Sequence, residues 1–300
     1  MNLSIVIVNW NTHDLLAACL ESVFATAGPS ELEVLVVDNA STDASGPMVR
    51  ERFPQVSLIG NQTNVGFARA NNQAIQRCQG RYVLLLNSDT QVIGNALEVM
   101  EAFMERHPRA GAAGARLLNA DGTLQPSCHP MLTPAREFWR LIFLDHLLHR
   151  ATYGTEFWKS SQPRQVEVIK GACLMLRREA LSEVGLLDES YFMYTEEMDL
   201  CFRLARAGWQ LWWVPAAQII HYGEASSRQA AQAMYIQLYR SKIQFYRKFG
   251  GETRATLFKW LVRLAYWPRF GLGAAGVFFS PGLAGWTQTV GRLLAELGDM

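Results

Sequence analysis

The chain has 300 residues, with 28 basic and 27 acidic side chains and a formal net charge of +1. This length can hold one large α/β domain or one and a half smaller ones. Because the charges nearly cancel, the composition argues against a nucleic-acid-binding protein, which needs a basic surface.

The spacing of the cysteines and the sequence of the N-terminus indicate the cellular compartment. The five cysteines are far apart and form no Cys-x-x-Cys pair. This spacing argues against a structural zinc site or a disulfide framework and favours a reducing environment. The N-terminus lacks the basic segment of a signal peptide and passes directly into an apolar run. We therefore expect an intracellular, cytoplasmic protein.

The first ninety residues alternate between expected strands and helices. The run Leu3–Val8 is continuously apolar apart from one serine, which is typical of a strand buried on both faces. Further strands are expected over 33–38, 56–59 and 82–86, with helices over 13–26, from the cap at 41–43 to about 53, and over 68–78. Such alternation predicts an α/β fold with a mainly parallel sheet flanked by helices.

Polar residues follow three of these strands. Asn9, Asp38 and Asp89 stand at or just beyond the carboxyl ends, where open α/β sheets bind their ligands. No Gly-x-Gly-x-x-Gly follows the first strand, and no Gly-x-x-x-x-Gly-Lys-Ser/Thr occurs. The dinucleotide-fold and P-loop interpretations are weakened accordingly.

A cluster of acids marks the start of another expected helix. Glu196, Glu197 and Asp199 follow Thr195, a good N-cap residue, and acids in a first turn suit the helix dipole. The preceding segment 185–193 is apolar and aromatic, so a carboxylate here would lie against a buried surface. Burial raises the basicity of a carboxylate, as a general base requires.

Each of the other polar motifs has a purely structural alternative. Asp38 with its neighbour Asn39 can form an Asx turn, and residues 64–66 can form a left-handed turn before a helix. Asp89 can cap the helix expected from about 95. His221 can be an ordinary histidine at a strand end rather than a metal ligand.

Taken in order, the motifs resemble one family. Four segments resemble the nucleotide-binding half of an inverting family 2 glycosyltransferase with the GT-A fold: SIVIVNWN at 4–11, VVDNASTD at 36–43, NVGFARANN at 64–72 and LLLNSDT at 84–90. Three more resemble its acceptor and catalytic half, at 171–175, 185–209 and 214–227. The resemblance covers about residues 3–250, and the nearest subgroup is the bacterial rhamnosyltransferase-like one.

The resemblance implies a donor site at the strand ends. Asp38 would accept a hydrogen bond from the pyrimidine base or the ribose of a dTDP- or UDP-sugar. The full nucleotide-sugar set implied is Asn9, Asp38, Asn64, Gly66, Arg69 and Asn87.

It also implies a divalent cation, Mg²⁺ or Mn²⁺, that bridges the diphosphate. Asp89 would be one ligand and His221 the second. A strict Asp-x-Asp motif would place an acid where this chain has Asn87.

The catalytic base implied is Glu197, which aligns with the second acid of the family's Glu-Asp pair, and Glu196 is the alternative. The acceptor side is assigned to Gly171, Ala172 and Asp188. Asp199 and Arg203 are spaced for an ion pair along one helix face.

The expected domain organisation has one GT-A domain over 1–250 and a helical tail over 251–300. Within the domain, about 1–110 would bind the nucleotide sugar and about 111–250 the acceptor. Residues 120–168 look like an insertion, either a helix that packs on the domain or a flap that faces the acceptor.

The tail carries an apolar stripe at helical spacing: Leu257, Trp260, Leu261, Leu264 and Trp267. Lys259, Arg263 and Arg269 add positive charge. Residues 270–291 carry no charge but contain six glycines and Pro281, which suits a spanning helix poorly. A basic helix rich in Trp suits a membrane interface, and packing on the domain or a dimer contact remain alternatives.

The sequence thus predicts an inverting transferase that moves a sugar to an acceptor hydroxyl by direct displacement. The subgroup suggests rhamnose, and a lipid-linked or polysaccharide precursor is the expected acceptor. Two alternatives stay open, a nucleotidylyltransferase and a non-catalytic sugar-nucleotide-binding protein. We expect no nucleic-acid partner, and a cytoplasmic location with peripheral contact to the inner face of the membrane.

Overall fold

The computed structural model describes residues 2–26, 31–147, 149, 151–223, 227–276 and 284–300. The expected break at 28–30, the end of the last motif at 224–226 and the segment around Pro281 lie outside the described residues. The chain divides into two compact units. Unit 1 comprises Met1–Met131, Thr155–Phe192 and Glu196–Gln229, and unit 2 comprises Leu132–Gly154, Met193–Thr195 and Ala230–Met300.

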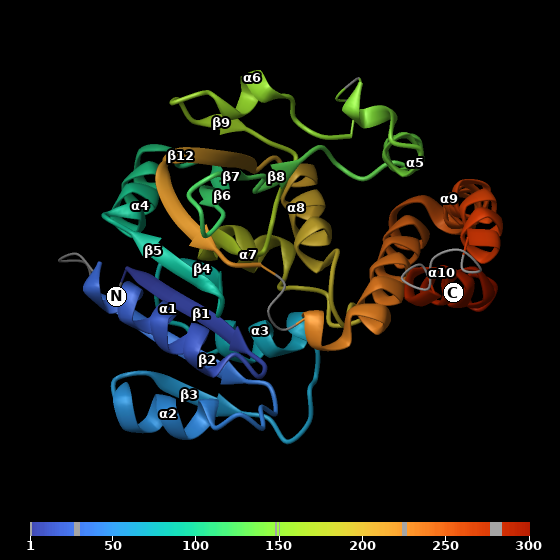
Figure 1. Ribbon diagram of the computed structural model, residues 1–300. Coiled ribbons are helices and arrows are strands. Elements are labelled where there is room, and N and C mark those ends of the chain that lie inside the picture. The colour runs from blue at the N-terminus through green and yellow to red at the C-terminus, as the bar shows by residue number, and fades with distance from the viewer. Residues whose placement is uncertain (1, 27–30, 148, 150, 224–226, 277–283) are drawn as a thin grey trace. The chain divides into compact units, whose positions relative to one another are not determined.

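The N-terminal half of unit 1 is a parallel sheet with helical crossovers, as the alternating sequence predicts (Figure 1). The four strands lie in the order β3-β2-β1-β4 and all their pairings are parallel. Helices form the connections because parallel neighbours cannot be joined by a tight turn. The strands are β1 (Leu3–Asn9), β2 (Leu32–Asp38), β3 (Ser57–Gly60) and β4 (Tyr82–Asn87), and the helices are α1 (His13–Ala25), α2 (Ser45–Arg52) and α3 (Phe67–Ile75).

The sheet continues beyond β4 with strands from later in the chain. β11 (Cys173–Arg177) is antiparallel to both β4 and β6 (Ala110–Leu118), and β12 (Gln210–His221) is parallel to β6. β5 (Thr90–Ile93) closes the order and pairs antiparallel with β12. It follows that β6 and β12 run in the direction of β1, β2 and β4, so their carboxyl ends share one edge of the sheet.

Smaller elements complete unit 1. β7 (Leu124–Gln125) pairs with β6, and β9 (Arg164–Gln165) pairs with β12. β8 (Cys128–His129) and β10 (Val168–Ile169) form a separate two-stranded sheet. The remaining helices are α4 (Ala96–Arg106), α6 (Thr155–Trp158), α7 (Arg178–Val184) and α8 (Glu196–Arg206). The 3₁₀ turn η2 (Ser227–Ala230) ends at Ala230, where the last segment of unit 2 begins.

The core of unit 1 holds the strands of the sheet against the helices that cover it. Apolar side chains of α1 and α4, such as Leu16, Leu20 and Met100, are fully buried in one cluster with alternate residues of the strands, such as Ile5 and Leu84. Burying a side chain of this size contributes about 1.5–3 kcal/mol. All five cysteines are buried free thiols.

Unit 2 consists of helices. α5 (Pro134–Leu141) and α10 (Ala284–Glu296) both pack on the long α9 (Ala231–Gly276), and η1 (Leu144–His146) is a short 3₁₀ turn. Gly251 has φ 72° and ψ 177°, a backbone conformation that glycine alone adopts without strain. Because this conformation is not helical, α9 is two helices joined at Gly251. Of the segment 120–168, the helix α5 packs on α9, whereas α6 belongs to unit 1.

A carboxylate and the cations that pair with it lie inside unit 2. Glu137 of α5 accepts hydrogen bonds from Lys242, at 2.5 Å, and from Arg140, at 2.8 Å. Burial alone would raise the pKa of Glu137, but the two cations outweigh it and lower that pKa to about 2.

Among the described residues, no helix has the length and apolar content needed to cross a membrane.

Candidate functional site

The edge at which the parallel strands end gathers the polar residues that the sequence singles out. Asn9 pairs in register with Asp38, and Val8 pairs with Asn87, so β1, β2 and β4 end side by side. β12 ends at the same edge with His221, which pairs with Thr90 of β5. The fold therefore brings together residues from four widely separated parts of the sequence.

Asn9 lies inside this edge and holds Asp38 in place. Its side chain is fully buried, donates to Ser41 Oγ at 3.0 Å and to Asp38 Oδ1 at 3.4 Å, and accepts from Thr12 at 2.6 Å. Asp38 remains partly exposed. A Cβ at Gly46 would lie 3.1 Å from Asp38 Oδ2, so the start of α2 leaves space for this carboxylate. Asp38 is thus the accessible member of the pair.

The loop before α3 is held by two asparagines. Asn39 donates to Asn64 Oδ1 at 2.8 Å, and Asn64 Oδ1 also accepts from the amide of Gly66 at 3.0 Å. Gly66 has φ 86°, and a Cβ there would lie 2.5 Å from the carbonyl oxygen of Phe192. Glycine is therefore required, and it lets the loop contact the segment that leads to the acidic cluster.

Arg69 lies on the exposed side of α3. Its Nε is 3.8 Å from a carboxylate oxygen of Glu189, and both side chains are largely exposed, so the pair contributes little stability. On the same helix Asn72 donates to the carbonyl of Leu187 at 2.8 Å and accepts from its amide at 3.1 Å. α3 thus connects the expected donor loop to the segment 185–192.

Asp89 and His221 face each other at the end of the sheet. His221 Nε2 is 3.3 Å from Asp89 Oδ1 and 3.3 Å from Asn87 Nδ2, and both ring and carboxylate are mostly buried. A carboxylate oxygen and an imidazole nitrogen are both accepted as ligands by divalent cations. No group of three or more His, Cys, Asp or Glu side chains in the described residues could hold a metal alone. Such a cation would need further oxygen ligands from a substrate or water.

The acidic cluster lies at the first turn of α8. Glu196 is buried, and one of its oxygens has no hydrogen-bond partner. Burial raises the pKa of Glu196 well above its usual range, and the adjacent charge of Glu197 raises it further. Glu197 is half-buried, and its Cβ is 3.8 Å from where a Cβ of Gly171 would stand. Oε2 is buried in both carboxylates, and as a whole residue Glu197 is the more exposed of the two.

The backbone before α8 is strained. Tyr194 and Thr195 have φ of 68° and 76°, a conformation that bulky and β-branched residues rarely adopt. The expected N-cap Thr195 therefore lacks the extended backbone of an ordinary N-cap. Each such residue costs about 1–3 kcal/mol, and this kind of strain gathers at functional sites.

The expected ion pair on α8 is confirmed. Arg203 Nε donates to Asp199 at 2.6 Å, and Asp199 is completely buried. The guanidinium also donates to the carbonyls of Val184 and Leu186. This pair fixes the segment before the acidic cluster to α8.

The residues expected on the acceptor side have different surroundings. The carbonyl of Ala172 accepts from the amide of Asn87 at 3.1 Å, so the segment Gly171–Ala172 lies against the end of β4. Asp188 Oδ1 accepts from both the amide and the hydroxyl of Ser190, which makes a tight turn.

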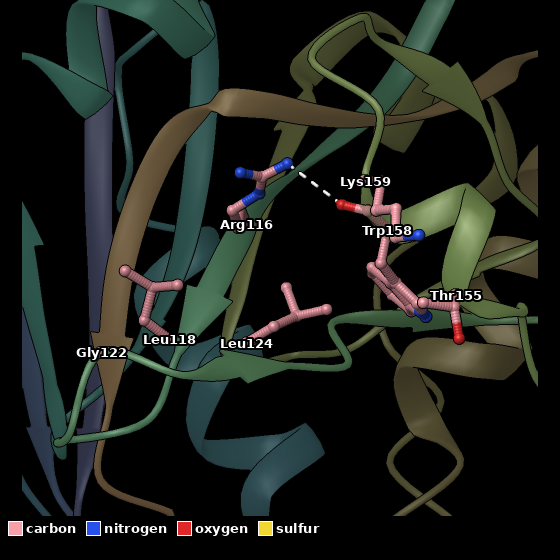
Figure 2. Close-up of a pocket in the computed structure, with 7 residues that line it drawn as sticks. All are labelled: Arg116, Leu118, Gly122, Leu124, Thr155, Trp158 and Lys159. Carbon is pink, nitrogen blue, oxygen red and sulfur yellow. Dashed lines mark hydrogen bonds between the residues drawn. The ribbon is translucent and has the colours of Figure 1, made fainter.

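A shallow cavity of about 320 Å³ lies elsewhere on unit 1. Figure 2 shows Arg116 pointing toward the backbone of Trp158, with Leu118 and Leu124 below Arg116 in this view. Arg116 donates to the carbonyls of Trp158 and Ser160. Because neighbouring strand residues point to opposite faces, Leu124 and Gln125 lie on different sides of the β6–β7 hairpin. The cavity is therefore separated from the His221 site.

Comparison with known sequences decides the family. The family model described as glycosyl transferase family 2 matches residues 4–185. An N-acetylglucosaminyl-diphospho-decaprenol L-rhamnosyltransferase of Mycobacterium tuberculosis is 30% identical over 277 residues, which cover 87% of this chain and 89% of that protein. The chain belongs to glycosyltransferase family 2. It is an enzyme that transfers a sugar from a nucleotide sugar.

Solved structures agree on the fold of this glycosyltransferase. A mannosyltransferase from Pyrobaculum calidifontis, in complex with GDP-Man and Mn²⁺, has a TM-score of 0.57 at 17% identity and covers 98% of this chain and 85% of its own. S. aureus TarS 1-349 in complex with UDP has a TM-score of 0.53 at 14% identity, with 88% and 71% covered. At these identities the likeness establishes the GT-A fold alone.

Several residues that organise the glycosyltransferase site were not identified from the sequence. Asn39, Asn72 and Gln125 each make side-chain hydrogen bonds that join separate segments. Asn39 and Asn72 lie within the motifs that carry the resemblance, so their position could have suggested a role. Gln125 has no such signal, because a glutamine after a turn is compatible with any exposed hairpin.

Proposed function

We propose that this glycosyltransferase moves a deoxyhexose, rhamnose, from dTDP or UDP to a lipid-linked glycan precursor, with inversion. The observation that carries the proposal is the meeting of Asp89, His221 and Asn87 at the strand edge where Asp38 is accessible. The name of the mycobacterial relative supports both rhamnose and a diphospho-polyprenol acceptor.

A divalent cation is the expected partner of the donor diphosphate. Asp89 Oδ1 and His221 Nε2 would hold it, since the two atoms lie 3.3 Å apart and both are ligands that divalent cations accept. Bound there, the cation would neutralise charge on the departing nucleoside diphosphate. The imidazole ligand favours Mn²⁺ over Mg²⁺, which binds mostly through oxygen.

Donor recognition rests on the same edge. Asp38 would accept from the base or ribose, with Asn9 holding it in place, and the loop Asn64–Arg69 would lie beside the nucleotide. The register of β1 and β2 supports a shared pocket for these residues.

Glu197 is proposed as the base that removes the proton from the acceptor hydroxyl. Its partial exposure beside Gly171 supports this role, whereas Glu196 is buried and held toward the neutral form. A base must be reachable by the acceptor, so Glu196 remains the second candidate. Gly171, Ala172 and Asp188 are proposed to lie on the acceptor side.

We also propose that unit 2 contacts an anionic membrane surface. Trp260, Leu264 and Trp267 of α9 are 63%, 62% and 57% exposed, and with Leu257 they form an apolar stripe that the rest of unit 2 leaves uncovered. Lys259 and Arg263 stand between them, with Arg263 lying over the ring of Trp260. Residues 253–276 contain four basic residues and no acidic one, which suits anionic lipid headgroups.

Arg269, the third basic residue of the expected set, makes contacts within unit 2. Arg269 donates to the carbonyl of Leu141 and lies over the rings of Phe143 and Tyr266. Because these groups of unit 2 contact its guanidinium, we assign the contact with lipid headgroups to Lys259 and Arg263.

A thermal-stability panel tests the proposed function. Purified protein would be heated with dTDP-, UDP- and GDP-sugars, each with and without Mn²⁺. A donor at about 100 times its Kd stabilises the folded protein by about 2.7 kcal/mol. We expect the pyrimidine nucleotide sugars to stabilise the protein in a Mn²⁺-dependent way, and Asp89→Ala to lose that dependence. A protein that no nucleotide sugar stabilises would contradict the proposal.

A further inference from the structure

The hairpin between β6 and β7 carries a chain of hydrogen bonds that starts at Asp121. Asp121 Oδ1 accepts from the amide of Thr123 at 2.9 Å and from its hydroxyl at 2.6 Å. Hydrogen bonds from the Thr123 hydroxyl and amide lower the pKa of Asp121. An ionised carboxylate only accepts hydrogen bonds, so the Thr123 proton must point toward Asp121.

Each following group is then oriented in turn. The Thr123 oxygen accepts from Asn119 Nδ2 at 2.9 Å, which turns Asn119 Oδ1 toward Gln125. Gln125 Nε2 donates to Asn119 Oδ1 at 2.9 Å and to the carbonyl oxygen of His221 at 3.1 Å. A flipped Gln125 amide would place its oxygen against two other oxygens, so its orientation is determined by its partners.

The chain ends on the ring of His221. Gln125 Oε1 is 2.6 Å from His221 Nδ1, and an amide oxygen can only accept, so Nδ1 carries the proton. At the other side of the ring, Asn87 Nδ2 lies 3.3 Å from Nε2 as a donor, which agrees with a lone pair on Nε2. Gln125 and Asn87 therefore favour the same tautomer, although Asp89 Oδ1, also 3.3 Å from Nε2, would accept a proton from that nitrogen.

We propose that Gln125 is a positioning residue, which through the hairpin 119–125 holds His221 in the Nδ1–H tautomer and directs the Nε2 lone pair toward Asp89. The inference rests on the proposed function, because a cation between Asp89 and His221 is what would use that lone pair. In the other tautomer an N–H would face Asp89 Oδ1, and a cation could bind only after the ring lost or moved that proton.

Nitrogen NMR of histidine-labelled protein without added metal tests the tautomer directly. The His221 signal is assigned from its loss in His221→Gln and is recorded above the pH at which the ring titrates. In the wild type we expect a protonated Nδ1 and an unprotonated Nε2. Gln125→Leu removes the acceptor opposite Nδ1 and should give a mixture of tautomers.

Leu124→Ala is the matched control, since it alters the same hairpin on the opposite face and should leave the His221 signals unchanged. Circular dichroism and thermal unfolding confirm that each variant folds. A wild-type ring protonated on Nε2, or an unchanged tautomer in Gln125→Leu, would overturn the proposal.

Mn²⁺ titration by calorimetry, with UDP present, gives the second readout. Loss of the outer hydrogen bond to a ligating histidine costs roughly 10–100-fold in metal affinity. We expect that loss in Gln125→Leu and no change in Leu124→Ala. Wild-type protein that binds no Mn²⁺ would contradict the proposed function, whereas the nitrogen spectra would still decide where the proton on His221 lies.

Discussion

Both compact units bury apolar side chains, but they differ in what they leave exposed. In unit 1 the strands and the inner faces of the helices are apolar and buried, and polar residues gather at the strand ends around Asp38 and Asp89. In unit 2 the charged pair Glu137–Lys242 is buried, and Trp260 and Trp267 are exposed. Each unit therefore presents a different kind of surface to its surroundings.

Unit 1 therefore suits a polar ligand, whereas the exposed stripe of unit 2 suits an apolar partner. Hydrogen bonds among the strand-end residues hold carboxylates such as Asp38 where a nucleotide can reach them. An exposed apolar stripe, by contrast, gains free energy only when another apolar phase covers it. A buried ion pair adds little net stability over apolar packing, but it is costly to break.

The largest expected effect lies in unit 1, at the acidic cluster. Glu197→Gln keeps the size of the side chain but cannot accept the proton, so kcat should fall roughly 10²–10⁴-fold. Binding of the nucleotide sugar, measured by calorimetry, should persist. If Glu197→Gln retains near-wild-type turnover and Glu196→Gln does not, the base has been assigned to the wrong carboxylate.

The second prediction breaks the ion pair of unit 2. Glu137→Gln leaves Lys242 buried without its counter-charge, which should lower the free energy of unfolding by about 3–5 kcal/mol. Because the folded pKa of Glu137 is about 2 and its unfolded value is 4.5, the ionised side chain stabilises the fold above pH 4.5. That contribution should disappear as the pH falls from 4.5 toward 2.

Denaturant unfolding of Glu137→Gln and of the control Glu156→Gln measures this effect. Glu156 makes an exposed pair with Lys159, so its loss should be within about 1 kcal/mol. Equal, small losses in both variants would show that the buried pair is not a determinant of the helical unit.

The third prediction concerns the exposed stripe of α9. Lys259 and Arg263 should each contribute about 1 kcal/mol of attraction to anionic lipid, so replacing both with Gln should weaken binding ~30-fold. Trp260→Ser and Trp267→Ser should weaken it further by removing apolar contact. Trp286→Ser, an exposed tryptophan outside the stripe, is the control.

Sedimentation with phosphatidylglycerol–phosphatidylcholine vesicles, compared with pure phosphatidylcholine, measures this binding. Added salt should reduce it, because the electrostatic part is screened. Equal, weak binding to both vesicle types at low salt would reject the membrane surface and leave a dimer contact as the alternative.

The smallest effect is expected from Glu196. Its pKa is raised in the folded protein, so the fold favours the neutral form and loses stability as the pH rises above the unfolded value of 4.5. Glu196→Gln removes this penalty. The melting temperature of Glu196→Gln, relative to that of the wild type, should therefore be higher at pH 8 than at pH 4. The control Glu179→Gln, at an exposed position, should show no such increase. A constant difference across that range would contradict the raised pKa.

The sequence predicted the parts of the fold that depend on local patterns. The apolar runs that became β1, β2 and β4, and the helices between them, were expected within a few residues of their actual bounds. The antiparallel insertion of β11 between β4 and β6 was not predicted, because pairing between distant strands leaves no periodic signal. The same limit hid the contact of Arg269 with Leu141.

For the site, the sequence identified residue types but not their partners. It placed Asp89 and His221 together through the resemblance, and the structure shows them 3.3 Å apart. It placed Asn9 in the pocket, whereas the buried amide of Asn9 is used by Ser41, Asp38 and Thr12. Roles for these residues in catalysis and donor binding stay predictions.

Calorimetry of UDP and dTDP binding with and without Mn²⁺, in the wild type, Asp89→Ala and Glu197→Gln, tests the central claim most directly. If the strand edge binds a cation and a diphosphate together, Mn²⁺ should strengthen nucleotide binding in the wild type and in Glu197→Gln, but not in Asp89→Ala. Unchanged Mn²⁺-dependent binding in Asp89→Ala would contradict the account, because the cation would then lie elsewhere.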